Sequence, residues 1–213
     1  PVGPGCPLSD ILRSGVVPAV RLTEIFRQAQ ESLIVMNAHR VNSGVMPDLK
    51  TVTSDFFFLR RRTEEAVAST IGDLCRTRLP DRMGIPPEEI QVLSPTRKGP
   101  TGTASLNLLL QAQLNPPAPD KKEKKWGDFS FREGDRVMQI RNNYDILWKK
   151  TDGTQVGTGI FNGDIGVITE IDLNAELLTV VFDDRQAEYD FDMLRELELA
   201  YAMTVHKSQG SEY

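Results

Sequence analysis

The chain has 213 residues, of which 39% are hydrophobic and 26% are charged, a balance typical of a soluble globular protein with a substantial core. No apolar run approaches the ~18 residues that would span a membrane, and residues 1–5 lack the pattern of a signal peptide. The net charge of −5 argues against a protein coated with nucleic acid. Two cysteines without a CxxC pair and two histidines make a metal site unexpected and favour a reduced, cytoplasmic setting.

The first part of the chain alternates between helical and strand patterns. Residues 1–18 are rich in glycine and proline and are expected to form a connector. Apolar residues at helical spacing predict a helix over 23–42, and the apolar run 55–59 predicts a buried strand. Thr63 is the expected N-cap of a second helix, which Pro80 should end.

A second strand is predicted over residues 90–93, and it is followed by a predicted helix over 103–114. The order is therefore helix, strand, helix, strand, helix. Such alternation favours a parallel sheet covered by helices, in which the functional loops follow the carboxyl ends of the strands.

The pattern of residues along the sequence changes at about residue 115. Residues 115–126 contain several prolines and a lysine-rich run, and they are expected to form a solvated linker. Short segments that are rich in β-branched residues or alternate between polar and apolar residues follow at 136–140, 166–171, 177–182 and 188–191. Predicted turns lie between them or beside them, at 133–135, 152–153, 162–164 and 183–184. These segments predict a small antiparallel barrel, and residues 197–205 predict one more buried strand. The expected fold class is an α/β sheet domain with a small barrel inserted before its last strand.

Polar side chains gather directly after this last predicted strand. They are Thr204, His206, Lys207, Ser208 and Gln209. Each can donate a hydrogen bond to a phosphate oxygen, and among them Lys207 brings the full charge. Gly210 would allow the backbone to approach a ligand closely. The alternative is a polar connection without a ligand, which is less common for such a dense group of donors.

A similar group of donors follows the strand predicted over 90–93, namely Thr96, Arg97 and Lys98. Because neighbouring parallel strands end at the same edge of a sheet, Thr96, Arg97, Thr204 and Lys207 are expected to line one groove. Such a row of hydroxyl and basic groups would follow a sugar–phosphate backbone. For Arg97 and Lys98 an ordinary solvated loop is an equal alternative.

Other candidates carry less weight. Arg27 lies near a predicted helix start, where an arginine can receive a phosphate, but a surface arginine is the more common interpretation. The run 60–62 of three arginines is either a solvated edge or part of a phosphate-facing rim. Asn143 lies in an Asn-Asn-Tyr-Asp segment that favours either contact with a base or a turn. No GxxxxGK[ST] loop occurs, and a complete P-loop nucleotide hydrolase requires one.

Taken together, these segments resemble the RecD-like (RecD/TraA) ATP-dependent DNA helicases of superfamily 1, over nearly the whole chain. The four segments that carry the resemblance are, in order, 2–5, 21–28, 92–99 and 204–212. The last of them matches motif V of the family almost letter for letter. Segments 134–139 and 161–166 resemble the SH3-like barrel that these enzymes insert in their second motor domain.

The resemblance implies the C-terminal portion of such a helicase. Its parts would be a connector (1–18), a second RecA-like motor domain (19–127 and 192–213) and an SH3-like barrel (128–191). It also implies that Arg27 is the catalytic residue at the γ-phosphate, with Gln28, Gly210 and Glu212 beside the ATP. The P-loop and the Mg²⁺-binding acid belong to the first motor domain of the family, and an arginine-bearing motif VI follows motif V. The sequence contains neither, so a truncated piece without activity of its own is expected.

The implied mechanism is movement along DNA. ATP with Mg²⁺ would bind between two RecA-like domains and close them, while the loops after the two strands hold single-stranded DNA by its phosphates. The motor would move 5′→3′ as a cytoplasmic monomer in DNA repair or recombination. The barrel would either guide the DNA strand or support the duplex fork. Two alternatives stay open: a stand-alone nucleic-acid-binding module without motor activity, and a protein-interaction scaffold favoured by the acidic charge balance.

Overall fold

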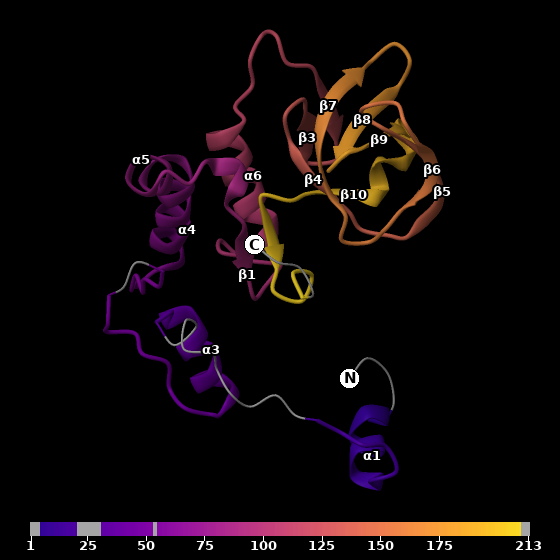
Figure 1. Ribbon diagram of the computed structural model, residues 1–213. Helices are drawn as coiled ribbons and strands as arrows, with labels where there is room; N and C mark the ends of the chain where they lie inside the picture. Colours follow the sequence, from indigo (N-terminus) through magenta and orange to yellow (C-terminus); the bar gives the residue numbers. More distant parts are fainter. Residues whose placement is uncertain (1–4, 21–30, 53–54, 210–213) are drawn as a thin grey trace. The chain divides into compact units, whose positions relative to one another are not determined.

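The computed structural model describes residues 5–20, 31–52 and 55–209, and the chain divides into two compact units, residues 1–60 and 61–213 (Figure 1). The regular secondary structure in the described part of the first unit is helical. The second unit combines a helix-covered two-stranded parallel sheet with a large antiparallel sheet. The mixed α/β class expected from the sequence is therefore confirmed at this level.

The first unit contains α1 (Pro7–Ser14) and α3 (Leu33–Asn42). The helix α3 begins at Leu33 because the Ser32 hydroxyl oxygen accepts a hydrogen bond from the Val35 N–H at 3.2 Å, as an N-cap does. The predicted helix over 23–42 is thus confirmed in its second half. Its expected start at Thr23 lies outside the described residues.

The buried strand predicted over 55–59 is wrong. These residues have no regular structure, and the side chains of Phe57 and Phe58 are about half exposed (51% and 52%). An apolar run becomes a strand only where a neighbouring strand pairs with its backbone N–H and C=O groups. No strand occurs among the described residues of this unit, so no β-strand there pairs with the run.

The second unit begins with a long, interrupted helix. Thr63 caps α4 (Glu64–Asp73), as predicted, by accepting a hydrogen bond from the Ala66 N–H at 3.2 Å. Pro80 does not end this helix, because a π-helical turn, η1 (Leu74–Arg78), leads directly into α5 (Leu79–Met83). In an α-helix a proline ring clashes with the carbonyl of the residue four positions earlier. The wider π turn moves this carbonyl away from the ring of Pro80. Gly84, with a φ of +67°, ends it.

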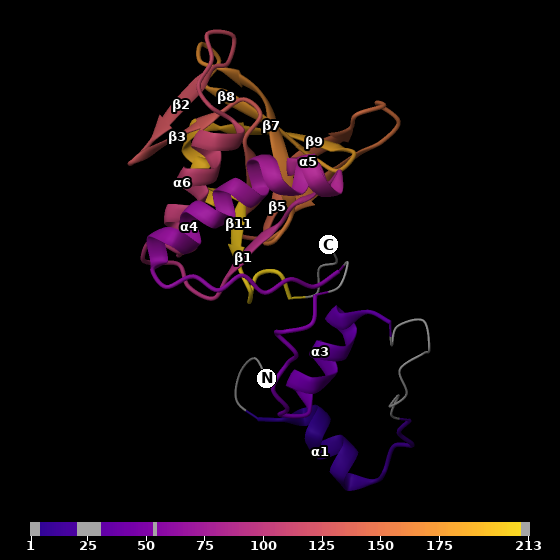
Figure 2. The same ribbon diagram turned by 90° about the vertical axis from the view of Figure 1, so that its left-hand side faces the viewer.

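The parallel sheet consists of β1 (Val92–Ser94), which follows the short helix η2 (Pro87–Glu89), and β11 (Ala202–Thr204). The helix α6 (Thr103–Leu114) packs on β11, and α4 packs on α6 (Figure 2). The boundaries of α6 agree with the prediction, and Leu106 and Leu110 are buried in the core. This layer places the carboxyl ends of β1 and β11 at one edge.

The antiparallel sheet has seven strands in the order β10-β4-β7-β8-β9-β5-β6, and it curls strongly on itself (Figure 1). The strands are β4 (Arg136–Gln139), β5 (Asn143–Lys150), β6 (Val156–Ile160), β7 (Ile165–Asp172), β8 (Leu177–Phe182), β9 (Arg185–Asp190) and β10 (Leu197–Leu199), and a 3-10 helix, η3 (Phe191–Glu196), precedes β10. We refer to this sheet as the barrel. The sequence predicted four of these strands near their observed positions but not β5 and β6.

The predicted linker 115–126 is wrong in its second part, which forms a hairpin. Strand β2 (Glu123–Trp126) pairs antiparallel with β3 (Phe129–Arg132). The Arg132 guanidinium lies 2.7 Å from the Glu123 carboxylate, and Phe131 is completely buried. The lysine-rich run is therefore part of a sheet whose partner strand contributes to the core.

The single strand predicted over 197–205 is in fact two strands in two sheets. Strand β10 pairs with β4 in the barrel, and β11 pairs with β1. Asn107 of α6 holds the crossing point: its amide nitrogen donates to the Leu199 and Ala202 carbonyls (2.7 and 3.0 Å), and its amide oxygen accepts from the Ala202 N–H (2.7 Å). The barrel sheet thus includes residues beyond 191, where the SH3-like domain was expected to end.

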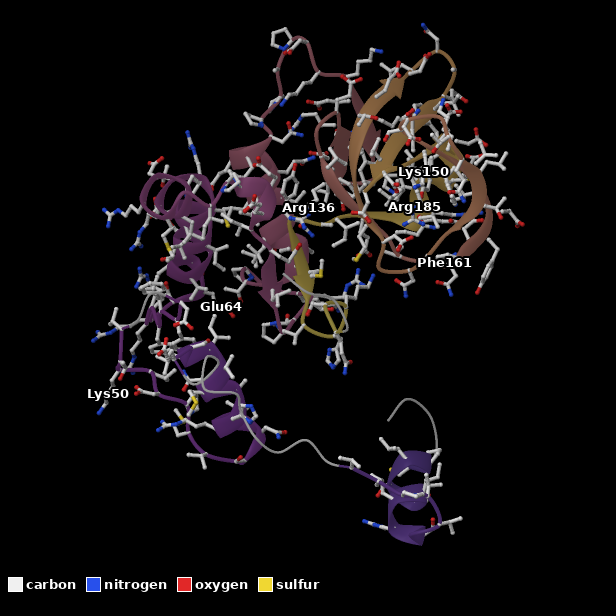
Figure 3. The ribbon with its side chains drawn as sticks, viewed as in Figure 1. Lys50, Glu64, Arg136, Lys150, Phe161 and Arg185 are labelled. Carbon is white, nitrogen blue, oxygen red and sulfur yellow. The ribbon has the colours of Figure 1, made fainter. Side chains whose placement is uncertain are left out.

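The buried carboxylate of Asp135 joins α6 to the barrel. It accepts hydrogen bonds from the Gln111 and Asn115 amides (2.6 and 2.7 Å), from the Arg132 N–H (2.7 Å) and from the Tyr201 hydroxyl (2.9 Å). On the same side, the guanidinium of Arg136 (labelled in Figure 3) donates to backbone carbonyls in the segment before β1. These polar contacts connect the helix layer, the barrel and the segment between β10 and β11.

Candidate nucleic-acid interface

Two loops that are far apart in the sequence meet at the carboxyl edge of the parallel sheet. In the β1·β11 register Ser94 lies opposite Thr204, and the Val205 N–H donates to the Ser94 carbonyl at 3.1 Å. The expectation that the segments after both strands leave the sheet at the same edge is therefore confirmed. We call them the 94–102 loop and the 204–209 loop.

Hydrogen bonds within the 94–102 loop give it a defined shape. The buried Ser94 hydroxyl donates to the Thr101 carbonyl at 2.8 Å and accepts from the Thr96 N–H at 3.3 Å. The Thr96 hydroxyl donates to the Lys98 carbonyl (2.7 Å) and accepts from the Lys98 N–H (3.1 Å). The hydroxyl of Thr96 is thus used in shaping the loop, while the side chain of Lys98 is exposed to solvent.

The same loop covers the first turn of α6. The carbonyls of Thr96 and Arg97 accept hydrogen bonds from the Thr103 and Ala104 N–H groups at 3.0 and 3.3 Å. Gly102 is needed at this junction, because a Cβ there would lie 2.6 Å from the Arg97 carbonyl oxygen. Two of the free N–H groups of the helix start are thereby satisfied, and the loop is held against a positive helix end.

The 204–209 loop is a compact turn. The Lys207 N–H donates to the Thr204 carbonyl at 2.9 Å, and the Ser208 hydroxyl donates to the Val205 carbonyl at 2.8 Å. Ser208 is buried, so its side chain serves the turn, whereas His206 and Gln209 are exposed. Four of the five predicted donors in this loop are therefore available to a ligand, namely the half-buried Thr204 and Lys207 and the exposed His206 and Gln209.

Basic side chains from both loops lie near one carboxylate. The Arg97 guanidinium is 2.6 Å from Glu198 of β10. Burial lowers the pKa of Lys207, the negative charge of Glu198 opposes this shift, and the positive charge of Arg97 adds to it. The sequence did not single out Glu198, because an acidic residue inside a predicted buried strand carries no recognisable signal of a role at a neighbouring loop.

Arginines of the 60–62 run lie beside the same edge. A cavity of about 370 Å³ is lined by Arg61, Arg62 and Thr63 together with Ser94 and Thr101. The cavity is therefore continuous with the 94–102 loop. The three arginines are exposed, and the Arg61 Nε–H donates a hydrogen bond to the Thr70 hydroxyl at 2.7 Å, so the solvated edge and the phosphate-facing rim both stay open.

Asn143 lies in the barrel, at the start of β5. Its amide nitrogen donates to the Glu196 carboxylate and its amide oxygen accepts from the Asp145 N–H, both at 3.0 Å. The bond to the Asp145 N–H is local, as in an Asx turn, but Asn143 is the first residue of β5, so neither interpretation of this segment is decided. Next to Asn143, the exposed Tyr144 ring meets the Phe161 ring edge to face, with the ring centroids 5.5 Å apart. Phe161, which is labelled in Figure 3, had not been singled out from the sequence.

The predicted ATP-contacting residues, Arg27, Gln28, Gly210 and Glu212, lie outside the described residues. Within residues 5–20, 31–52 and 55–209, no group of three or more histidine, cysteine or acidic side chains is placed to hold a metal ion. In the same ranges, no helix is long and apolar enough to cross a membrane.

The chain is similar to known helicase sequences. Residues 106–182 match the family described as ATP-dependent RecD-like DNA helicase SH3 domain. Over all 213 residues the chain is 32% identical to the ATP-dependent RecD2 DNA helicase of Deinococcus radiodurans, of which it spans 26%. The chain belongs to the RecD-like helicase family. It is also 32% identical over 142 residues to Uncharacterized protein MJ1519 of Methanocaldococcus jannaschii, a match that covers 59% of this chain and 12% of that protein.

In this RecD-like chain, the match to the family's SH3 domain begins at Leu106 inside α6 and ends at Phe182, the last residue of β8. It therefore includes both partners of the hydrogen bond between Gln111 and Asp135. The matched segment is more than the barrel, because it contains most of α6, including Asn107, which is hydrogen-bonded to Ala202 of β11.

Proposed function

We propose that the chain is the second RecA-like motor domain, with its inserted SH3-like barrel, of an ATP-dependent helicase that moves 5′→3′ on single-stranded DNA. The motor domain would comprise 19–127 and 192–213, and residues 1–18 would connect to the first motor domain. The inserted SH3-like domain would comprise 128–191 and so contain every strand of the barrel except β10. The parallel pairing of β1 with β11 carries this proposal, since it brings two donor-rich loops to one edge in a member of a helicase family.

The phosphates of a single strand would bind along this edge. Arg97, Lys98 and Lys207 supply positive charge, while Thr204, His206 and Gln209 supply neutral donors. Thr96 and Ser208 hold their loops in shape through their hydroxyls. Asn143 would lie farther along the strand, on the barrel near the duplex fork.

The ATP would bind to residues on this chain and on another motor domain. An arginine donates two parallel hydrogen bonds to phosphate oxygens, so Arg27 fits a γ-phosphate, with Gln28, Gly210 and Glu212 beside the nucleotide. We assign the Mg²⁺ ligands and the P-loop to the first motor domain, because the sequence has no GxxxxGK[ST] loop. The bound nucleotide with Mg²⁺ would supply the energy of translocation, and the role of this chain would be to sense the γ-phosphate and hold DNA.

Binding of a fluorescein-labelled oligothymidylate, measured by fluorescence anisotropy, tests the DNA contacts. We expect an affinity that falls as the salt concentration rises, and a loss of about 3- to 10-fold in each of Arg97→Ala and Lys207→Ala at low salt. The matched control is Lys149→Ala, which removes an exposed lysine from β5 and should leave the affinity unchanged. Binding without salt dependence, unaffected by either loop variant, would remove both loops from the interface.

A stand-alone nucleic-acid-binding module without motor activity is the second candidate. It is favoured by one observation, namely that both donor-rich loops and the barrel belong to the same compact unit. The monomeric state and a role in DNA repair or recombination remain predictions from the family resemblance.

A further inference from the structure

One acidic side chain lies among the basic groups of the proposed interface. Glu198 is on β10, where it pairs with Met138 of β4, and its carboxylate accepts a hydrogen bond from the Arg97 guanidinium at 2.6 Å. Arg97 belongs to the 94–102 loop. A strand of the barrel thus holds the loop that extends from the parallel sheet.

The Glu198 carboxylate also affects Lys207, which belongs to the 204–209 loop. Burial lowers the pKa of Lys207, while the negative charge of Glu198 opposes this shift and the positive charge of Arg97 adds to it. Glu198 therefore forms an ion pair with the cation of one loop and acts electrostatically on the cation of the other. When no DNA is bound, the Glu198 carboxylate occupies the position beside Arg97. A DNA phosphate that binds Arg97 has to take this position.

A carboxylate and a phosphate compete for a guanidinium group. Both are anions that accept the two parallel hydrogen bonds of an arginine, so Arg97 cannot make its full set of contacts with both. The side chains of Arg97 and Glu198 are 62% and 34% exposed. Solvent weakens an ion pair this exposed, so a phosphate of the DNA backbone can displace the carboxylate.

We propose that Glu198 is an intramolecular competitor of phosphate, which occupies Arg97 and attracts Lys207 in the free protein and so weakens the grip on single-stranded DNA. This inference rests on the proposed function, because it requires the two loops to be the site of DNA binding. Glu198 acts through Arg97 and touches no substrate, so it is a positioning residue that sets affinity. A motor that steps along DNA must release each phosphate, and a built-in competitor speeds this release.

The deciding experiment compares Glu198→Gln with the parent chain in the anisotropy assay with labelled oligothymidylate. The amide keeps the size of the side chain and removes its charge. We expect affinity to increase about 3- to 10-fold at low salt, equivalent to about 0.7–1.4 kcal/mol. We also expect the plot of log affinity against log salt concentration to become steeper by about 0.7. The reason is that Arg97, which no longer pairs with a carboxylate, is then free to neutralise one more phosphate.

Three matched variants separate this role from general effects of charge. Glu170→Gln removes an exposed acid from β7 and should leave the affinity and the salt slope near those of the parent chain. Glu198→Asp keeps the charge and should bind DNA like the parent. In the double variant Arg97→Ala/Glu198→Gln, most of the gain should disappear, since the competitor and its target are both absent. Far-UV circular dichroism and a thermal melt check that each variant is folded.

Three results would overturn the inference: unchanged or weaker binding by Glu198→Gln, an equal gain in Glu170→Gln, or a full gain in the Arg97→Ala background. Failure of this inference and failure of the proposed function are distinguishable. If Arg97→Ala and Lys207→Ala weaken binding but Glu198→Gln brings no gain, the loops bind DNA and Glu198 is merely structural. If neither alanine variant affects binding, the proposed interface and the role of Glu198 both fail.

Discussion

At the scale of single residues, the environment of Lys207 connects the fold to DNA binding. Its ammonium group is half-buried in the 204–209 loop, and this burial lowers its pKa below the ordinary lysine value of 10.5. A phosphate would favour the charged form, so the pKa of Lys207 should rise when DNA binds. Binding is then accompanied by proton uptake whenever the free protein has lost part of this charge.

The pH dependence of DNA binding follows from this linkage. We expect the affinity for single-stranded DNA to fall as the pH rises through the alkaline range, beginning below 10.5, because the lysine charge in the free protein is lost there. Lys207→Arg, whose guanidinium stays charged, should bind with little change over the same range. Anisotropy titrations at several pH values check this, and an identical pH profile for both proteins would contradict it.

At the scale of elements, α6 is the centre of the second unit. Its first turn carries the 94–102 loop, its middle holds the crossing from β10 to β11 through Asn107, and its last turns reach Asp135 through Gln111 and Asn115. Burial raises the pKa of Asp135, and the four hydrogen bonds that its carboxylate accepts oppose this shift. The helix, the barrel and β11 therefore depend on one another for their positions.

Asp135→Asn tests this dependence. An amide cannot accept all four hydrogen bonds, and its own N–H₂ group faces donors, so we expect the free energy of unfolding to fall by about 2–4 kcal/mol. Urea denaturation followed by circular dichroism measures the change. Asp128→Asn, in the exposed turn between β2 and β3, is the matched control and should change stability little. Equal stability of the two variants would show that the Asp135 contacts do not hold the unit together.

The elements also show why some sequence patterns are unreliable. Strand β6 contains Gly157 and Gly159, residues that strands usually avoid, yet a Cβ at these positions would collide with the rings of Trp148 and Phe161. Strand β5 changes register between Asn143 and Leu147, which disturbs the alternation that marks a strand. Both strands were missed because close contacts with aromatic rings and a register shift replace the alternation of polar and apolar residues that marks a strand.

At the scale of the whole molecule, the chain spans about a quarter of the RecD2 relative, and its sequence has no P-loop. We therefore expect the purified 213-residue chain to show no ATP hydrolysis above background in a phosphate-release assay. Robust turnover by this chain would refute the assignment of the P-loop and the Mg²⁺ ligands to another domain.

In a longer form that contains a P-loop domain, Arg27→Ala should abolish hydrolysis, by about 10³-fold or more, and largely spare DNA binding. The loss would follow from the missing positive charge at the γ-phosphate. Arg40→Ala, which removes an exposed arginine from α3, is the control. Normal turnover by Arg27→Ala would make Arg27 a surface residue.

The sequence by itself determined those elements whose signals lie within a few residues of one another. The helix over 103–114 and the N-cap at Thr63 are of this kind, and so are the donor-rich segments that resemble motifs of the RecD-like family. Only the tertiary structure decided that residues 197–205 divide between two sheets and that 55–59 form no strand. The physical reason is that strand pairing and ion pairs join residues distant in the chain, as Ser94 with Thr204 and Arg97 with Glu198 show.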